Sequence, residues 1–595
     1  MASGKKGKSS PSSGSRRRRR RTDKLEAGCV ATGGNTTLRS YAVGGLPLIN
    51  HILQRMRLPE ILDEQLPADD PRVKLPTRRA LLVLVRNVLM SREPIYGVAP
   101  WALRYPPELL DLWPEELEYL TDDCLGRSLA RFFRSVGPPL VLAVVRQVIQ
   151  QFAVRLDELH NDSTTVTFYG AYAEAAEEGR RGGRPTHAIT WGHNKDHRPD
   201  LKQLLYILTV SDDGGVPVYF TSASGNVVDD KTHCQTWDLL RELVQRPDFL
   251  YVADCKVATT ENMNYIAQRG GRFVSVLPRS RKEDTQFRER LRQTPQAVTW
   301  QHLYDVTGED ERLLDRFQVV REEAVSAEGY RLLWFHSSRK AELDAATRSR
   351  RIQRALAKLS ALRDRLHGPR TRFRQRPQVE DAVQKILDQF SVERWLQVQI
   401  DQRQQTTYHQ ARPGRPNKDT PYRKQLTTRY TFSWHIDTAA LLAEESSDGV
   451  FPLISNAREM DAEELLRAYK RQPIIEKRFS QLKTEFAVAP VYLKEVSRIQ
   501  GLLAVYFLAL LVQTLLEREL RQAMQRQQIP SLPLYPEGRA CHRPTTARVL
   551  EAFDNVQRHV LTYPGGQEEV MVTELSPLQR QILELLGMSA DTYGR

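Results

Sequence analysis

Residues 249–277 read FLYVADCKVATTENMNYIAQRGGRFVSVL, and this stretch decides the fold class of the 595-residue chain. The apolar run at 249–253 predicts a short buried strand, and 259–268 predicts a helix that ends at the glycine pair 270–271. A second strand is predicted over 273–277. A strand, a helix and another strand in succession indicate a mixed α/β core.

The residues before this unit add further strands. β-branched and aromatic residues over Thr164–Tyr169 predict a first strand. The runs Leu204–Val210 and Val216–Thr221 flank Asp212-Asp213-Gly214-Gly215, which predicts a hairpin because glycine tolerates the positive φ of a tight turn. A helix is predicted over Thr232–Val244. Strands and helices are therefore expected throughout residues 156–280.

Both ends of the chain have a different character. Residues 1–38 are rich in Ser, Gly, Lys and Arg, which predicts a disordered basic arm. The longest apolar run, Gly501–Val512, is shorter than the roughly 20 residues that a membrane span needs, so a buried helix is expected. Helical periodicity is seen in several segments: 39–155, 461–486, 495–526, 545–560 and 576–587.

The formal charge of +14 is concentrated at the N-terminus. Residues 1–22 contain nine cations and no acid, which leaves +5 for the rest of the chain. Such a surplus favours a polyanionic partner without identifying it. The five cysteines form no Cys-x2-Cys pair, so neither a zinc finger nor a disulfide framework is expected. A reducing, cytoplasmic environment is the expectation.

Three carboxylates have surroundings that suit chemistry. Asp254 closes the apolar strand at 249–253, at the sheet edge where α/β folds bind ligands. Asp162 stands at the entrance to the first strand. Each aspartate alone is equally well explained as a turn or capping residue. The third carboxylate, Glu476, lies in a longer stretch with a regular pattern.

That stretch, residues 469–483, reads YKRQPIIEKRFSQLK. With about 100° of rotation per helical residue, the spacing brings three further side chains to the helix side that holds Tyr469: Gln472, Glu476 and Lys483. Pro473 predicts a helix start or a kink. An ordinary solvated helix face explains Lys477 and Arg478, and explains the aligned polar set less well.

Phosphodiester chemistry gives these residue types a common purpose. Two divalent ions about 3.5–4 Å apart activate the attacking hydroxyl and stabilise the leaving oxygen. Mg²⁺ prefers a few carboxylates together with waters and phosphate oxygens. Two strand aspartates and a glutamate on a packed helix are the minimal protein contribution, and a lysine can neutralise phosphate charge.

The chain resembles an insertion-sequence transposase of the DDE class, in the family-four branch with the signature Tyr-x2-Arg-x3-Glu-x6-Lys. Tyr469, Glu476 and Lys483 match that signature with the right gaps. Gln472 stands where the signature has arginine, with Arg471 beside it. Two further stretches look familial: Asn161–Thr165 and Lys195–Lys202.

The resemblance implies an RNase H-like mixed sheet flanked by helices, with Asp162, Asp254 and Glu476 as catalytic residues and ligands of two Mg²⁺ or Mn²⁺ ions. It implies an enzyme that binds terminal inverted repeats, nicks the ends and joins 3′ hydroxyls to target DNA as a dimer or larger oligomer. Either Arg471 replaces the signature arginine, or the contact at Gln472 is weaker. The implied DNA contacts are Tyr469, Arg471, Gln472 and Lys483.

The expected organisation follows from this resemblance and from the texture of the sequence. Its parts are a disordered basic arm (1–38), a helical DNA-binding domain (39–155), the first part of the RNase H-like core (156–280), a β-rich and helical insertion (281–448), the core completion with the catalytic helix (449–526) and a helical C-terminal region (527–595).

Two other functions stay open on sequence alone. One is a metal-dependent nuclease of similar core that cuts without joining ends, and the Tyr/Glu/Lys helix argues against it. The other is a non-catalytic, transposase-derived DNA-binding protein, against which all three carboxylates argue. Basic runs are expected to track phosphates with salt-sensitive affinity: Arg16–Arg21, Arg180–Arg184, Arg279–Lys282, Arg370–Arg376 and Arg412–Lys424.

Overall fold

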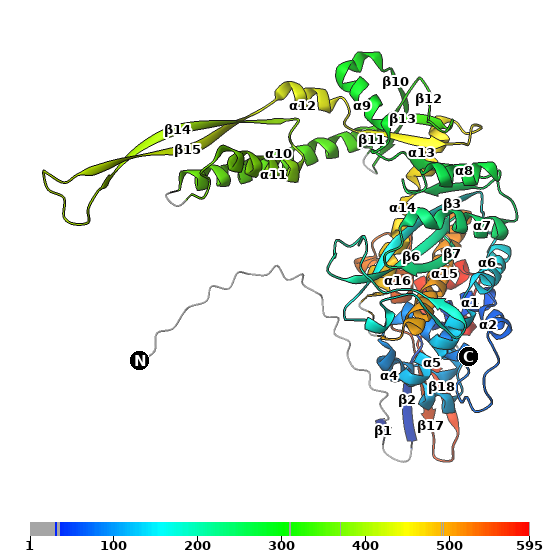
Figure 1. The fold of residues 1–595 in the computed structure, drawn as a ribbon. Helices are drawn as coiled ribbons and strands as arrows, with labels where there is room; N and C mark the ends of the chain where they lie inside the picture. Colours follow the sequence, from blue (N-terminus) through cyan, green and yellow to red (C-terminus); the bar gives the residue numbers. More distant parts are fainter. Residues whose placement is uncertain are drawn as a thin grey trace.

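The computed structural model describes residues 30–32, 36–308, 311–368, 371–489, 491 and 493–593. Figure 1 shows a body built around a large sheet, from which a long projection extends to one side. We call this projection, residues 338–436, the lateral arm. Most of the predicted basic arm at 1–38 lies outside the described residues.

Five strands at the centre of the body form a mixed sheet in the order β7-β6-β3-β8-β9. β3 pairs antiparallel with β6 and parallel with β8, and β8 pairs parallel with β9. The predicted hairpin and strand–helix–strand unit are confirmed. The bounds are β3 Glu158–Phe168, β6 Lys202–Ser211, β7 Pro217–Ser224, α7 His233–Val244, β8 Leu250–Ala253, α8 Thr260–Gln268 and β9 Arg272–Val276.

The turn between β6 and β7 is also a packing site for helices. Gly214 and Gly215 have φ of +78° and +68°, as the predicted tight turn requires. A Cβ atom on Gly215 would lie 2.8 Å from Cγ1 of Ile474, which belongs to α14, Pro473–Ser480. The second glycine therefore serves both the turn and the close approach of α14.

The sheet continues beyond β9 through β16, β13, β11 and β10, each antiparallel to its neighbour. β10, β11 and β13, which fall within the predicted insertion at 281–448, therefore extend the sheet of the body, and β13 pairs with β16 from Arg331–Ser455 to His336–Val450. Their bounds are β10 Trp300–Thr307, β11 Leu313–Val320, β13 Arg331–Ser337 and β16 Val450–Ser455.

Helices before the sheet confirm the predicted helical character of 39–155, and they pack around one late helix, α15, Val496–Arg526. By length and composition α15 could cross a membrane, yet 94% of its apolar window is buried in the body. The expected buried helix at 501–512 is thus confirmed. The earlier helices are α1 Leu46–Arg55, α2 Leu58–Gln65, α3 Thr77–Met90, α4 Val98–Ala102, α5 Asp122–Ser135 and α6 Pro138–Phe152.

The two ends of the described chain meet in a second sheet of order β1-β2-β17-β18. The predicted helix over 545–560 is wrong after Glu551, because α16, Thr546–Glu551, is followed by strands. Likewise, residues 36–38 lie in β2 and not in a disordered arm. The bounds are β1 Val30–Thr32, β2 Thr36–Ala42, β17 Gln557–Thr562, β18 Glu568–Val572 and α17 Pro577–Leu585.

The lateral arm has an apolar core of its own, separate from the core of the body. Its helices are α10, Ser338–His367, and α11, Arg376–Phe390. Its strands, β14 Leu396–Gln410 and β15 Tyr422–Ile436, pair only with each other, in a 15-residue antiparallel register. The base of this pair packs on the helices through residues such as Leu396 and Phe432.

Candidate active site

Asp162 lies in the middle of β3, and not at its entrance as predicted, because the strand already begins at Glu158. Its carboxylate accepts hydrogen bonds from the Ser163 amide at 2.7 Å and from Lys195 Nζ at 3.2 Å. Burial raises the pKa of Asp162 to about 6, the Lys195 ammonium opposes this rise, and the charge of Asp254 adds to it. The site therefore holds a desolvated carboxyl group.

Asp254 directly follows β8, as predicted. β3 and β8 pair in parallel with Asn161 opposite Ala253, so the next residues, Asp162 and Asp254, occupy neighbouring positions. Asp254 Oδ1 accepts a hydrogen bond from the Lys256 amide at 3.0 Å. The structure thus brings two of the three predicted acids together at the sheet edge, 92 residues apart in sequence.

The third acid, Glu476, is presented on the exposed side of α14. The single helix predicted over 461–486 is wrong: α13, Ala462–Lys470, ends before α14, and a π-helical segment, Gln481–Glu485, follows. The predicted start at Pro473 is confirmed, because proline occupies the first turn of α14. The acid and Lys483 are therefore carried by different helical segments.

A network of hydrogen bonds around the buried Glu158 and His160 fixes the junction between α13 and α14 to β3. Glu158 accepts hydrogen bonds from Arg471, through Nε at 2.7 Å and through Nη2. Its Oε1 also lies 2.7 Å from His160 Nε2. Neighbouring Arg471 lowers the pKa of Glu158 to about 2 against the opposing effect of burial. His160 is fully buried. Its Nδ1 lies 3.0 Å from Oε1 of Gln472, which extends the network to that residue.

This network includes both residues that bear on the missing signature arginine. Arg471, whose side chain is 44% exposed, pairs with the buried Glu158, and Gln472 contacts His160 and donates to the Asn161 carbonyl at 3.4 Å. Both polar groups help to hold the helix junction on the sheet, and their contact with DNA stays a prediction. Neither Glu158 nor His160 was singled out from the sequence. Their only sequence signal is an acid and a histidine two positions apart, just before the strand predicted at 164–169.

The far end of α14 is clamped as firmly. Arg478 donates hydrogen bonds to the carbonyls of Gly214 at 2.6 Å and Gly215 at 3.0 Å. It also pairs with Glu517 of α15 at 3.1 Å, and both side chains are buried. Because α14 is tied at both ends, the direction in which Glu476 points is set by the β3 strand and by the β6–β7 turn.

Two lysines of the predicted site regions are paired with acids. Lys483 Nζ lies 2.6 Å from Asp196 Oδ1, and Asp196 Oδ2 accepts a hydrogen bond from Thr165 at 3.3 Å. Lys195 bonds Asp162, Ser163 Oγ and the Ser163 carbonyl. The stretch 195–202 therefore links the π-helical segment to β3. Its sequence suggested a family resemblance but no role.

Tyr469 lies at the end of α13, beside the acids. Burial raises its pKa to about 12, and the negative charges of Asp254, Cys255 and Glu476 contribute to that rise. The phenol is therefore neutral over the working range of pH and can donate a hydrogen bond. The charges of Asp254 and Glu476 therefore both act on the Tyr469 phenol.

The donor chemistry of Asp162, Asp254 and Glu476 fits a hard divalent cation, since all three offer carboxylate oxygens. The desolvated Asp162 beside Asp254 gives a local surplus of negative charge that a cation relieves. Among the described residues, however, no group of three or more His, Cys, Asp or Glu side chains is close enough to hold a metal ion. The carboxylates of Asp162, Asp254 and Glu476 are therefore not close enough together in this arrangement to bind one metal ion jointly.

Comparison with known proteins adds a family to this geometry. Residues 158–512 match the family model described as "Transposase DDE domain", which is more than half of the chain. No curated protein matches the sequence. One similar solved structure is a cryo-EM structure of the piggyBac transposase synaptic complex with hairpin DNA, at 11% identity and a TM-score of 0.23. The match covers 49% of this chain and 58% of that chain, so this chain spans little more than half of that protein.

Proposed function

Since the chain belongs to the transposase DDE-domain family, we propose that this DNA transposase is an insertion-sequence enzyme of the family-four, Tyr-Arg-Glu-Lys branch. It binds the terminal inverted repeats of its element, nicks the DNA ends and transfers the 3′ hydroxyl ends to target DNA. One observation carries the proposal: Asp162 and Asp254 stand on neighbouring strands, and α14, which bears Glu476, is tied across the same sheet.

The strand order supports an RNase H-like core. Two antiparallel pairs, β7-β6 and β6-β3, are followed by two parallel pairs, β3-β8 and β8-β9, with helices between the parallel strands. In such a sheet the carboxyl ends of the parallel strands gather polar groups at one edge. Residues between β9 and β16 then form the insertion that separates Asp254 from Glu476.

In this proposal Asp162, Asp254 and Glu476 hold the divalent ions. When bound, such ions activate a hydroxyl nucleophile and stabilise the leaving oxygen of the phosphodiester. The chain's own residues supply the surroundings. Tyr469 stays protonated and donates a hydrogen bond to DNA, while Lys483 offers a positive charge beside Asp196 for a phosphate oxygen.

The partners proposed are duplex DNA, as element ends and as target, and a second copy of the chain in the active complex. Two element ends must be held together before both can be joined to one target, which requires at least a dimer. Because an insertion-sequence enzyme acts on genomic DNA, the proposed location is the cytoplasm, in association with the nucleoid.

The test is a strand-transfer assay with the full chain, Mn²⁺ or Mg²⁺, and a DNA substrate that carries the inverted repeats flanking its own coding sequence. We expect nicking at the ends and joining to a plasmid target. Asp254→Ala removes a carboxylate at a strand terminus and should abolish both steps while the protein stays folded.

Three outcomes separate the candidates. Nicking without joining would favour a nuclease, and neither step with normal DNA binding would favour a non-catalytic binding protein. Equal nicking by wild type and by Asp254→Ala would refute the assignment of the site. Asp248→Ala, which removes an exposed aspartate just before the start of the same strand, β8, is the matched control.

A further inference from the structure

The distal part of β14 and β15 is a free-standing two-stranded ribbon. Each strand has 15 residues, so at about 3.3 Å per residue the ribbon is about 50 Å long. Only its base packs on α10 and α11, and beyond Tyr430 the residues of both strands are exposed or half-buried. Figure 1 shows the end of the ribbon far from the body of the molecule. The candidate active site lies in the body, near β3 and α14.

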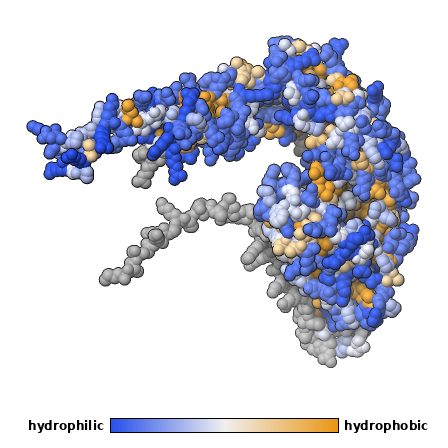
Figure 2. Space-filling model, in the orientation of Figure 1, coloured by the Kyte–Doolittle hydropathy of each residue, from blue (hydrophilic) through white to orange (hydrophobic). Residues whose placement is uncertain are grey.

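The ribbon concentrates positive charge. Residues 396–436 contain seven Lys or Arg and two Asp, a surplus of +5. This equals the whole surplus of residues 23–595, so the rest of that range is formally neutral. Figure 2 shows the end of the lateral arm as hydrophilic, with few apolar atoms. A surplus of this size on one projecting element is an electrostatic footprint for a polyanion.

The two faces of the ribbon differ. The register places alternate residues from Gln397 to His409 and from Arg423 to His435 on one face, which we call the polar face. None of its positions is apolar. The opposite face begins with the apolar residues that pack on the helices and ends with exposed rings, of which Tyr408 is 66% exposed. The polar face is uncovered in its distal part, whereas nearer the base Thr431 lies 3.1 Å from His367 and Arg429 donates a hydrogen bond to the Gly368 carbonyl at 3.3 Å.

The arrangement of the cations on the polar face destabilises the isolated protein. Arg403 lies directly opposite Arg429, and like charges in such a pair destabilise a hairpin. Among the described residues, Arg403 and Arg423 are both exposed and take part in no ion pair. Glutamine and threonine fill most of the remaining positions, and these side chains can hydrogen-bond base edges. A polyanion that also presents donors and acceptors satisfies both features.

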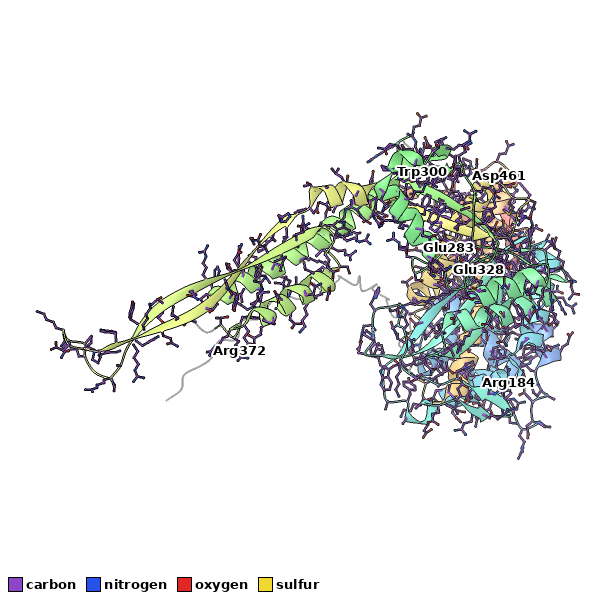
Figure 3. All side chains as sticks on the ribbon, turned by 45° about the horizontal axis from the view of Figure 1, so that its top comes forward. Arg184, Glu283, Trp300, Glu328, Arg372 and Asp461 are labelled. Carbon is purple, nitrogen blue, oxygen red and sulfur yellow. The ribbon has the colours of Figure 1, made fainter. Side chains whose placement is uncertain are left out.

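We propose that the β14–β15 ribbon is a second DNA-binding element, which lies in the major groove of a duplex with its polar face toward the base edges. The major groove admits a two-stranded ribbon. Residues 411–421 at the tip, with Arg412, Arg415 and Lys418, then reach the phosphates that border the groove. Figure 3 shows side chains projecting along both edges of the ribbon and labels Arg372 on the helical part of the arm.

This inference rests on the proposed function and extends it. The contacted duplex is remote from Asp162 and Asp254, so the ribbon binds either a distant part of the element end or the DNA held by a second copy. Gln405 and Gln425 lie on the polar face and are exposed. They are the side chains placed to read bases, whereas Arg403 and Arg423 supply charge.

The experiment uses the full chain and a duplex of about four helical turns selected by the wild-type chain from a random-sequence pool. Binding is followed by fluorescence anisotropy over a range of salt. Arg403→Ala with Arg423→Ala should lower the salt slope by about 2 and weaken binding about tenfold. Gln405→Ala with Gln425→Ala should lower discrimination against unselected duplex at an unchanged slope.

Two matched controls separate position from composition. Arg321→Ala with Arg526→Ala removes the same charge from exposed sites outside the ribbon, and should leave the slope unchanged. Gln402→Ala with Gln404→Ala removes two exposed amides from the opposite face, and should leave discrimination unchanged. A trimmed chain, with 401–431 replaced by Asn-Gly between the paired Ile400 and Phe432, should bind as weakly as the arginine variant or more so.

Groove occupancy is read from methylation of guanine N7, which faces the major groove. We expect a protected patch with the wild-type chain that disappears with the arginine variant. Equal binding by the ribbon variants and their controls would overturn the proposal. So would equal competition by single-stranded DNA or duplex RNA, or unprotected N7 atoms. A chain that binds through the ribbon yet joins no ends would refute the proposed function alone.

Discussion

The candidate active site and the lateral ribbon treat their charges in opposite ways. Around the site, charged groups are paired within the protein: Arg471 with Glu158, Lys195 with Asp162, and Arg478 with Glu517. On the ribbon, Arg403 and Arg423 are exposed and unpaired within the described chain. The first arrangement fixes geometry at the cost of desolvation, and the second keeps charge available for a partner. The orientation of the site residues and the affinity for DNA thus depend on different parts of the molecule.

The largest expected effect separates these two parts directly. Asp162→Asn should lower nicking and joining by at least about 10³-fold, since a neutral amide cannot replace a carboxylate that carries the reaction. Its DNA affinity should stay within about twofold of wild type. The trimmed ribbon should show the converse, weak binding with normal nicking once DNA is saturating. Single-turnover nicking and anisotropy measure the two quantities, and a joint loss in either variant would break the comparison.

The next effect concerns stability. Glu517→Ala leaves the buried Arg478 without its acid, which should cost about 3–5 kcal/mol in the free energy of unfolding. The matched change in the arm, Asp381→Ala, removes the exposed partner of Lys385 and should leave that free energy unchanged within error. Urea unfolding at neutral pH measures both. Equal losses would contradict the contrast between buried and exposed pairs.

A smaller effect depends on pH. The folded-state pKa of Glu158 is lowered to about 2, so its stabilisation is complete above the unfolded value near 4.5 and is lost as pH falls toward 2. This shift corresponds to roughly 3 kcal/mol. The difference in unfolding free energy between wild type and Glu158→Gln should therefore shrink between pH 6 and pH 3. A difference that stays constant with pH would show that the ion pair with Arg471 does not stabilise the fold.

The smallest effect tests the network at the helix junction. Gln472→Arg restores the signature residue but places a second guanidinium beside Arg471 and removes the oxygen that faces His160. We expect about tenfold slower nicking with unchanged DNA affinity. Gln472→Glu keeps an oxygen at that position and should lose less. Faster nicking or tighter binding by Gln472→Arg would mean that this position serves DNA contact and not helix placement.

Much of the central sheet could be predicted because its signals are local. The glycine pair of the β6–β7 turn and the apolar run before Asp254 each specify an element from a few neighbouring residues. The break between α13 and α14 was visible in Pro473. The local pattern failed at residues 557–562, which form β17. This strand pairs with its neighbour β18 and also with β2, more than 500 residues earlier.

The candidate site was predictable in part for the same reason. Asp254 is recognisable from the sequence because it directly follows an apolar strand. The roles of Glu158 and His160 depend instead on contacts with Arg471 and Gln472, more than 300 residues away. Side chains that meet across such distances leave no spacing in the sequence. The long ribbon was also missed as one unit, because its exposed strands lack the alternation of apolar residues that identifies half-buried strands.

The position of α15 has a consequence for biosynthesis. This helix fills the centre of the body and contacts α1, α3 and α5. It is synthesised some four hundred residues after them, so these helices leave the ribosome long before their packing partner does. The lateral arm, complete at residue 436 with its own core, can fold before then. Translation therefore yields a finished arm ahead of a finished body, and a chain terminated early would carry the ribbon without the centre that supports catalysis.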